Sequence, residues 1–161
     1  MNKGIIVMIG LPGSGKSTEV KRLIESGEAS KLTGCKSVVR LNKDCMREML
    51  HFEAYNKSNE EEVRMAEMHL AISFIGSGIG LVIDNTNSRA RNIQKWLTLA
   101  EDLGAELKAV VMHSGVETCV GRDMLRERTV GRESIERRNK IFDEEREAIF
   151  KLLKGHEVIN V

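Results

Sequence analysis

The first residues whose types and spacing suit chemistry form a glycine-rich stretch near the start of the chain. Gly10, Gly15, Lys16 and Ser17 match the pattern GxxxxGK(S/T) without deviation, directly after the apolar run "IIVMI". Glycines let backbone N–H groups turn toward an anion with no Cβ in the way, and the helix that follows presents its positive N-terminus to the same anion. The stretch therefore predicts a loop that cradles the phosphates of a nucleotide.

The residues of this loop have separate expected roles. The ammonium of Lys16 would reach the outer phosphates, and the hydroxyl of Ser17 would bind Mg²⁺. The letters "NKDC" at 42–45 match a guanine-reading signature, but they follow the loop too soon to read a base, so we predict ATP with Mg²⁺. The residues expected to bind the nucleotide in this loop are Gly10, Pro12, Gly13, Ser14, Gly15, Lys16, Ser17 and Thr18.

A second group of residues could act on the molecule that receives the phosphate. The stretch "LNKDCMREML" follows an expected strand, at the end of the strand where open parallel sheets bind ligands. Asp44 and Arg47 are three residues apart and would share one helix face, where the carboxylate could accept a proton from a hydroxyl group. The arginine could hold a phosphate or carboxylate of the acceptor. A structural alternative stays open, in which Asp44 caps the helix and Arg47 pairs with Glu48 or Glu53.

A third candidate lies in "LVIDNTN", an apolar strand that ends in the carboxylate of Asp84. In P-loop proteins such a carboxylate can hold Mg²⁺, directly or through water. The polar run over residues 85–87 would then lie at the mouth of the sheet. The alternative is a polar turn that caps a helix beginning near Ser88.

An arginine-rich segment over residues 121–138 completes the set. Arg122 and Arg126 are one helical turn apart, and "RTVGR" interrupts two helical patterns and could flex at Gly131. A mobile hairpin that carries arginines could close over ATP and neutralise charge on the phosphoryl group in transfer. Because acidic residues interleave with the arginines, a solvated face of ion pairs is the alternative.

The elements that must position these residues alternate along the chain. Apolar runs predict strands at 4–9, 37–42, 81–84, 106–112 and 156–161, and helical patterns occupy 16–26, 43–54, 59–75, 88–103, 116–128 and 133–153. Alternating strands and helices indicate an α/β fold with a parallel sheet covered on both faces. We predict one domain over residues 1–161, with a five-stranded parallel sheet between helices and a helical lid at about 121–138.

Composition narrows the function classes. The chain has 161 residues with a net charge of +1, so global charge does not predict nucleic-acid binding, which would need a local patch. Cys35, Cys45 and Cys119 are odd in number and widely spaced, which indicates reduced thiols rather than disulfides or metal ligands. Without a long apolar run or a signal-peptide pattern, the expected protein is soluble and cytoplasmic, with no membrane partner.

Four stretches together resemble a known family. "GLPGSGKST", "LNKDCMRE", "IDNTN" and "VGRDMLRERT" are similar, in order and spacing, to the successive motifs of the 5′-polynucleotide kinase family, in particular the kinase domain of bacteriophage polynucleotide kinase–phosphatase. The first motif is common to many P-loop enzymes, and the other three are more specific. The resemblance covers about residues 3–150 and implies an adenylate-kinase-like P-loop NTPase fold. It also implies transfer of the γ-phosphate of ATP to the 5′-hydroxyl end of DNA or RNA.

The resemblance implies roles for particular residues. Asp44 matches the family's general base, and Arg47 matches the arginine that contacts the 3′-phosphate of the acceptor. Arg126 best matches the lid arginine that stabilises the phosphate in transfer, with Arg122 as its neighbour. Lys16, Asp44 and Arg126 are thus the implied catalytic residues.

The acceptor side departs from the family pattern in two ways. The family's D-T-N becomes "DNTN", so Thr86 and Asn87 align while one extra residue separates them from Asp84. No aromatic residue stands between Asp44 and Arg47, and an apolar contact to a base is expected instead from Val130 or Thr86. The DxDGT signature of the family's phosphatase domain is absent, so we expect no 3′-phosphatase activity.

Two other functions remain open at this point. A small P-loop kinase of a sugar, an antibiotic or a nucleotide-sugar, as in zeta-toxin-like proteins, would use the same aspartate on a different hydroxyl. A non-catalytic ATP-binding switch would use Asp44 and the lid arginines as partner contacts. The sequence leaves open the choice between DNA and RNA and whether the chain forms a homo-oligomer.

Overall fold

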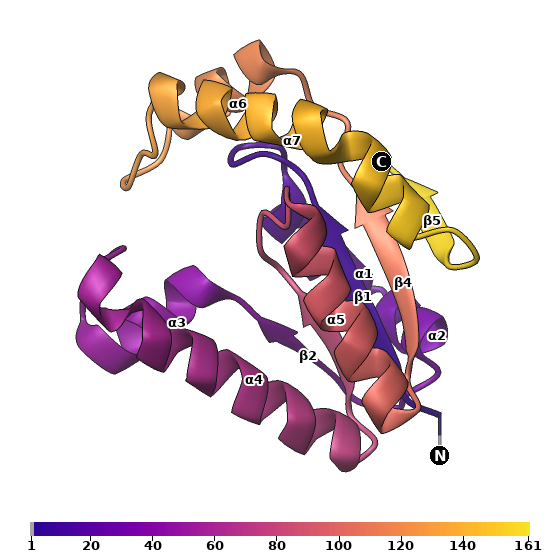
Figure 1. The fold of residues 1–161 in the computed structure, drawn as a ribbon. Helices are drawn as coiled ribbons and strands as arrows, with labels where there is room; N and C mark the ends of the chain where they lie inside the picture. Colours follow the sequence, from indigo (N-terminus) through magenta and orange to yellow (C-terminus); the bar gives the residue numbers. More distant parts are fainter. Residues whose placement is uncertain (1) are drawn as a thin grey trace.

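The computed structural model describes residues 2–161, which fold around a five-stranded sheet (Figure 1). The strands are β1 (Gly4–Ile9), β2 (Val38–Leu41), β3 (Gly80–Ile83), β4 (Glu106–Val111) and β5 (Glu157–Asn160). Their order is β2-β3-β1-β4-β5, and each neighbouring pair is parallel, with Ile5 of β1 aligned to Leu81 of β3 and Leu107 of β4. The predicted α/β fold with five parallel strands is confirmed.

Helices cover both faces of this sheet. They are α1 (Lys16–Glu25), α2 (Glu28–Thr33), α3 (Lys43–His51), α4 (Glu60–Gly76), α5 (Ala90–Leu103), α6 (Val116–Asp123) and α7 (Arg132–Leu152), with a 3₁₀ turn η1 (Lys57–Asn59) before α4. Helices α1 and α2 pack on one face, and α4, α5 and α7 pack on the other. Within residues 2–161, no helix combines the length and the apolar character that crossing a bilayer needs.

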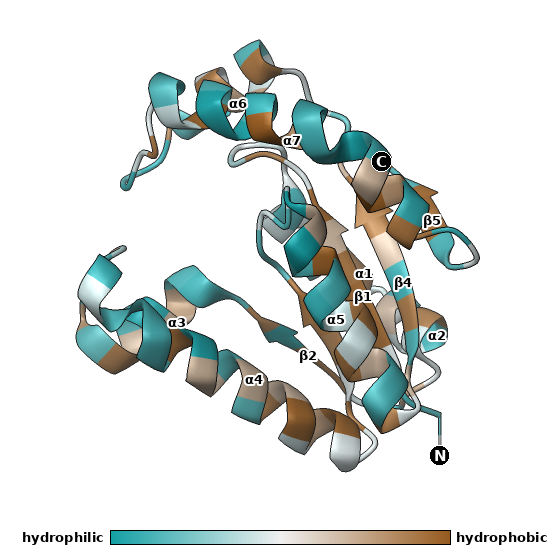
Figure 2. Cartoon of the chain, viewed as in Figure 1, coloured by the Kyte–Doolittle hydropathy of each residue, from teal (hydrophilic) through white to brown (hydrophobic). Residues whose placement is uncertain are grey.

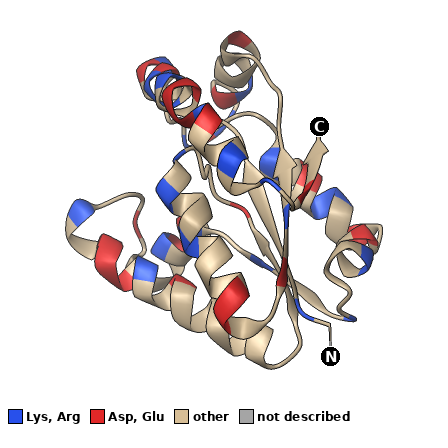
Figure 3. Cartoon of the chain, turned by 45° about the vertical axis from the view of Figure 1, so that its right-hand side comes forward, with Lys and Arg blue, Asp and Glu red and all other residues tan. Residues whose placement is uncertain are grey.

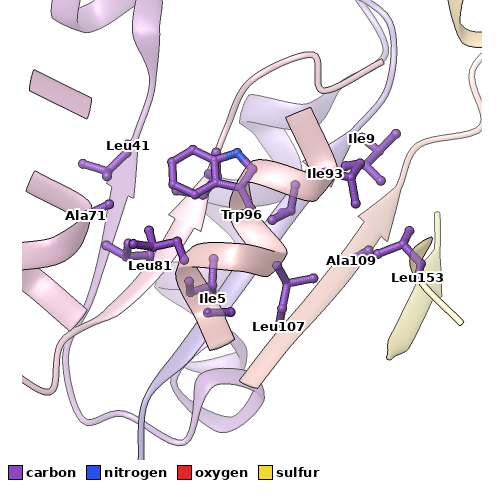
Figure 4. Packing of buried hydrophobic residues seen from close by; sticks show 14 of the residues in the cluster. Ile5, Ile9, Leu41, Ala71, Leu81, Ile93, Trp96, Leu107, Ala109 and Leu153 are labelled. Carbon is purple, nitrogen blue, oxygen red and sulfur yellow. The ribbon is translucent and has the colours of Figure 1, made fainter. Parts of the chain in front are cut away.

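Strand β1 is buried along its whole length because both of its faces meet a layer of helices. Ile6 and Met8 belong to the core under α1 and α2, whereas Ile5 and Ile9 belong to the larger core on the other face. Trp96 of α5 lies in the middle of that larger core (Figure 4). Figure 2 shows the hydrophobic residues concentrated on the strands, while α6 and the first half of α7 are mostly hydrophilic.

Two predicted helices end earlier than their patterns indicate. The helix expected over 116–128 ends at Asp123, because the buried Asp123 carboxylate accepts the backbone N–H groups of Val130 and Gly131 and so folds the chain back. The helix expected over 43–54 ends at His51, after which Phe52 has a left-handed φ of 54°. Helix α2 was not predicted, because six residues are too few to show a helical period.

The loops that carry the candidate residues meet at the carboxyl ends of the strands. Helix α6 and the first half of α7 lie above this edge, and α3 lies beside it (Figure 1). The fold thus brings the glycine-rich loop, the end of β2, the end of β3 and the arginine-rich segment to one side of the molecule, as the sequence predicts.

Candidate active site

The glycine-rich loop joins β1 to α1, in the strand–loop–helix context that its pattern requires. Gly13 has a φ of +81°, and a Cβ there would lie 2.3 Å from the carbonyl oxygen of Cys119, so only glycine fits this close approach to α6. The Lys16 ammonium, on a side chain only 9% exposed, donates to the carbonyl oxygens of Gly10 at 2.9 Å and Leu11 at 2.6 Å. Burial lowers the pKa of Lys16 to about 8. The loop therefore holds the largely buried cation of Lys16, the residue predicted to reach the outer phosphates of the nucleotide.

Ser17 and Asp84 bring two side chains with oxygen atoms close together near Lys16. The Ser17 hydroxyl donates to Asp84 Oδ2 at 2.8 Å, and the second carboxylate oxygen of Asp84 is buried without a hydrogen-bond partner. Mg²⁺ prefers oxygen ligands and commonly takes one or two from the protein and the rest from phosphates and water. The two side chains fit such an ion, and residues 2–161 contain no cluster of three His, Cys, Asp or Glu side chains that would compete for a metal.

Sequence reasoning missed Arg40, which reaches the same carboxylate from β2. Its Nε donates to Asp84 Oδ2 at 2.8 Å, and its Nη2 lies 3.4 Å from the Ser17 hydroxyl. The available signal was an arginine inside the otherwise apolar run "SVVRLN". Asp84 is thus held through Oδ2 by Ser17 and Arg40 at the loop, and Oδ1 is the oxygen left to reach a metal ion.

The loop and the arginine-rich segment line an open cavity of about 670 Å³. Its lining includes Ser14, Gly15 and Thr18 from the loop and both predicted arginines, Arg122 and Arg126. The Arg122 guanidinium donates to the Ser14 carbonyl oxygen at 3.3 Å, so it already lies against the loop. The cavity therefore brings together six of the ten residues that the sequence assigns to the nucleotide, and Gly10, Pro12, Lys16 and Ser17 are not among its lining residues.

Two sets of contacts hold the segment between α6 and α7, one to the end of α6 and one to α3. The buried Asp123 carboxylate accepts from Val130 and Gly131 at 2.9–3.1 Å, while Arg126 is about half exposed, with its Nη1 4.0 Å from Asp123. Arg128 forms a 2.6 Å ion pair with Glu48 of α3, which joins the segment to the opposite side of the site. Figure 3 shows that basic and acidic residues interleave over the helices here. Within residues 2–161 the contact with Asp123 is the one ion pair of Arg126, whose side chain also lines the cavity.

On the acceptor side, Asp44 is the second residue of α3 and its side chain is 88% exposed. Asn42, not Asp44, caps the helix, because the Asn42 side chain accepts the N–H of Cys45 at 3.0 Å. The open alternative in which Asp44 caps the helix is therefore wrong. The carboxylate instead accepts from Arg47 Nη1 at 2.5 Å and otherwise faces outward.

Arg47 pairs with neither Glu48 nor Glu53. Its Nε and Nη2 bind the two carboxylate oxygens of Glu60 at 2.5 and 2.9 Å, a two-point contact across 13 residues of sequence. This contact lowers the pKa of Glu60 and raises the pKa of Arg47. Arg47 thus has three N–H groups committed to carboxylates, and its arrangement holds Asp44 in place.

The polar run after β3 supports the ends of the strands. Asn87 is buried and donates to the Met8 carbonyl oxygen at 2.8 Å, and the Thr86 carbonyl oxygen accepts the Gly10 N–H at 3.1 Å. None of this run caps the following helix, because the first N–H of α5, at Ala90, donates to Glu145 of α7 instead. The alternative in which this run caps the helix is therefore wrong, and the amide of Asn87 is used by the fold.

An aromatic side chain does lie beside Arg47, although the motif contains none. Tyr55 is 67% exposed, and the Arg47 guanidinium lies 5.5 Å from the centre of its ring. Sequence reasoning missed it because it follows Arg47 by eight residues, beyond the end of α3. Val130, the expected source of an apolar contact, is partly exposed on the lid.

Comparison with known proteins identifies a family and a shared fold. A family model described as an AAA domain matches residues 5–152. Among solved structures, the chain is similar to one in the Pnkp1/Rnl/Hen1 RNA repair complex, with a TM-score of 0.76 and 22% identity over 91% of this chain and 46% of that one. A second Pnkp1/Rnl/Hen1 complex gives a TM-score of 0.65 and 24% identity over 80% of this chain and 42% of that one. The chain thus spans less than half the length of the chains it matches in these complexes.

A shorter protein matches almost end to end. The Mycobacterium tuberculosis APS kinase CysC, solved with AMPPNP and APS, has a TM-score of 0.57 and 17% identity over 95% of this chain and 98% of its own. At these identities the similarities establish a shared P-loop kinase fold. No curated protein sequence matches the chain.

Proposed function

The chain belongs to the AAA domain family, and from that premise we propose that it is an ATP-dependent polynucleotide 5′-hydroxyl kinase. The observation that carries the proposal is Asp44, an exposed carboxylate held by Arg47 at the start of the helix that follows β2. A similar chain takes part in an RNA repair complex, which supports a nucleic-acid acceptor. The single domain over residues 1–161 would hold both the ATP site and the acceptor site.

In the proposed reaction, the loop N–H groups and Lys16 bind the phosphates of ATP. Ser17 and Asp84 would hold Mg²⁺, which neutralises charge on the phosphates when bound. Asp44 accepts the proton of the 5′-hydroxyl group as its oxygen attacks the γ-phosphorus, and the bond from that phosphorus to the β–γ bridging oxygen breaks. Arg126, with Arg122 beside it, stabilises charge on the phosphoryl group.

The test is transfer of label from γ-labelled ATP with Mg²⁺. A 5′-hydroxyl oligonucleotide is compared with the same oligonucleotide already phosphorylated at its 5′ end. We expect label only on the hydroxyl form. Failure to label either one, with ATP still bound, would contradict the proposal and favour a small-molecule acceptor, and slow hydrolysis alone would favour an ATP-binding switch.

Tyr55 is expected to support a base of the acceptor. Stacking on an aromatic ring contributes ~1–3 kcal/mol per base, so Tyr55→Ala should raise the KM for an oligonucleotide roughly tenfold while the KM for ATP stays unchanged. Tyr55→Phe keeps the ring and is the matched control. Steady-state kinetics with both substrates decide the matter, because equal effects of the two substitutions would exclude stacking.

A further inference from the structure

Arg40 is the one charged residue of β2, and it lies on the face of the sheet that α1 covers. In the sheet register Arg40 is aligned with Val82 of β3, which belongs to the core under α1 and α2. Asp84 follows Val82 by two residues, and side chains two residues apart along a strand share a face. The fold thus places an arginine on the same face as Ser17 and Asp84, the pair that fits Mg²⁺.

The guanidinium of Arg40 contacts both of these side chains. Its Nη2 lies 2.6 Å from Asp84 Oδ2 and 3.4 Å from the Ser17 hydroxyl, and its Nε donates to the same Oδ2 at 2.8 Å. The other oxygen, Asp84 Oδ1, is buried without a hydrogen-bond partner. Any metal ion that Asp84 shares with the Ser17 hydroxyl would therefore lie beside the guanidinium.

The burial of Asp84 explains why its carboxylate needs a cation. The Asp84 side chain is 1% exposed, and among residues 2–161 Arg40 is the one basic residue that forms an ion pair with it. A buried carboxylate without a positive partner is costly, so the guanidinium stabilises it when no metal is bound. Arginine stays protonated in proteins, and its charge repels a divalent cation that approaches the same carboxylate. The Arg40 side chain is 35% exposed, so it is the partner that can turn toward solvent.

We propose that Arg40 takes the place of Mg²⁺ in the nucleotide-free protein and makes binding of the ion depend on nucleotide. Before nucleotide binds, the guanidinium supplies the positive charge that Asp84 requires and opposes a free metal ion. The phosphates of ATP bring negative charge and oxygen ligands to the loop, so Arg40 can be replaced at Asp84 when ion and nucleotide bind together. This role rests on the Mg²⁺ site of the proposed kinase function, but not on which molecule accepts the phosphate.

The test measures binding of Mn²⁺, which favours the same oxygen ligands as Mg²⁺, to protein without nucleotide. The electron paramagnetic resonance signal of free Mn²⁺ is followed during a titration. A unit charge beside a divalent ion changes its affinity about tenfold or more, so Arg40→Gln should bind Mn²⁺ more tightly than the wild type by that factor. Arg40→Lys, which keeps a positive charge, should stay close to the wild type. Arg64→Gln is the matched control, because it removes an arginine from an exposed ion pair with Glu61 on α4.

A double variant identifies where the additional metal binds. Arg40→Gln combined with Asp84→Asn removes both charges, so no buried carboxylate is left without a partner and the chain should fold. It should bind Mn²⁺ no more tightly than the wild type. Additional binding that persists in the double variant would place the metal elsewhere and overturn this role of Arg40. Equal affinities of Arg40→Gln, Arg64→Gln and the wild type would also overturn it.

Thermal unfolding gives a second readout that does not depend on activity. Without metal, Arg40→Gln should unfold at a lower temperature than the wild type, because Asp84 has lost its cation. Mn²⁺ should raise the unfolding temperature of Arg40→Gln but not that of the wild type, since only a ligand bound to the native state stabilises it. Folding of Arg40→Gln only when Mn²⁺ is present would support the replacement of a guanidinium by a metal. A variant that Mn²⁺ fails to stabilise would contradict it.

The last comparison adds a non-hydrolysable ATP analogue at saturation. The wild type should now bind Mn²⁺, and the difference in Mn²⁺ affinity between the wild type and Arg40→Gln should shrink. A difference of unchanged size would contradict replacement of Arg40 by an ion that arrives with nucleotide. No acceptor is present in these measurements, so they stay interpretable if label transfer to an oligonucleotide fails, and their failure leaves the kinase proposal standing.

Discussion

Asp44→Ala is expected to lower kcat for phosphoryl transfer by roughly 10²–10⁴, the usual cost of removing a general base. The KM for ATP should change little, because the residues that line the nucleotide cavity lie in the loop, β4, the lid and the C-terminal strand. Rates are measured with saturating ATP and a 5′-hydroxyl oligonucleotide. Unchanged turnover would remove Asp44 from the reaction.

The same substitution should leave the fold intact, which makes the kinetic result interpretable. Asn42 caps α3 without help from Asp44, and Arg47 keeps its two-point contact with Glu60. An exposed ion pair contributes only ~0–1 kcal/mol to the free energy of unfolding. Glu61→Ala is a suitable control, since Glu61 is an exposed carboxylate that pairs with an arginine three residues later, but on α4. It should match the wild type in both rate and stability.

The sheet could be predicted because its signals are local. Strand β1 is a continuous apolar run, which is what a parallel strand covered on both faces requires. The loop after it carries its chemistry in fixed spacing, and Gly104 ends α5 in a left-handed conformation where the pattern predicted a stop. In such elements the residue type and its neighbours in sequence determine the structure.

The partners of the charged residues could not be predicted in the same way. Arg47 pairs with Asp44 three residues earlier, as helical spacing allows, but its two-point partner is neither Glu48 nor Glu53. That partner is Glu60, which only the packing of α3 on α4 brings close. Glu67 stands in an acidic helical pattern, yet it is fully buried and binds Lys95 of α5 at 2.7 Å. Helical spacing limits which pairs can form within one helix, but contacts between helices decide which pairs do form.

The end of α6 also depends on a contact that spacing in the sequence does not predict. Charge periodicity continues the helix of α6 past Asp123, and local propensity offers no reason to stop it there. The helix ends because a buried carboxylate captures two N–H groups seven and eight residues ahead. Gly131, with a φ of +85°, then provides the turn into α7. The predicted interruption between the two helices is present, and the predicted end of the first helix was wrong for a tertiary reason.

Lys16→Met is expected to reduce kcat/KM by roughly 10²–10³, the cost of removing one preorganised group that stabilises charge in the reaction. Methionine has a similar length and no charge, so the loop loses its cation while much of the packing is kept. Turnover is measured with the oligonucleotide acceptor. Lys21→Met is the control, because Lys21 lies on the same helix, is exposed and pairs with Glu25.

The stability of this variant should change by no more than ~2 kcal/mol, because two effects oppose each other. Burial lowers the pKa of Lys16 to about 8, so the fold disfavours its charged form, and methionine removes that cost. The carbonyl oxygens of Gly10 and Leu11 lose their donor, which costs ~1–3 kcal/mol for each oxygen left unsatisfied. Urea unfolding without nucleotide measures the balance between these two effects.

An ATP analogue should raise the urea midpoint of the wild type and of Lys21→Met but not of Lys16→Met, since only a bound ligand stabilises the native state. A variant that failed to fold would instead identify Lys16 as a structural residue of the loop.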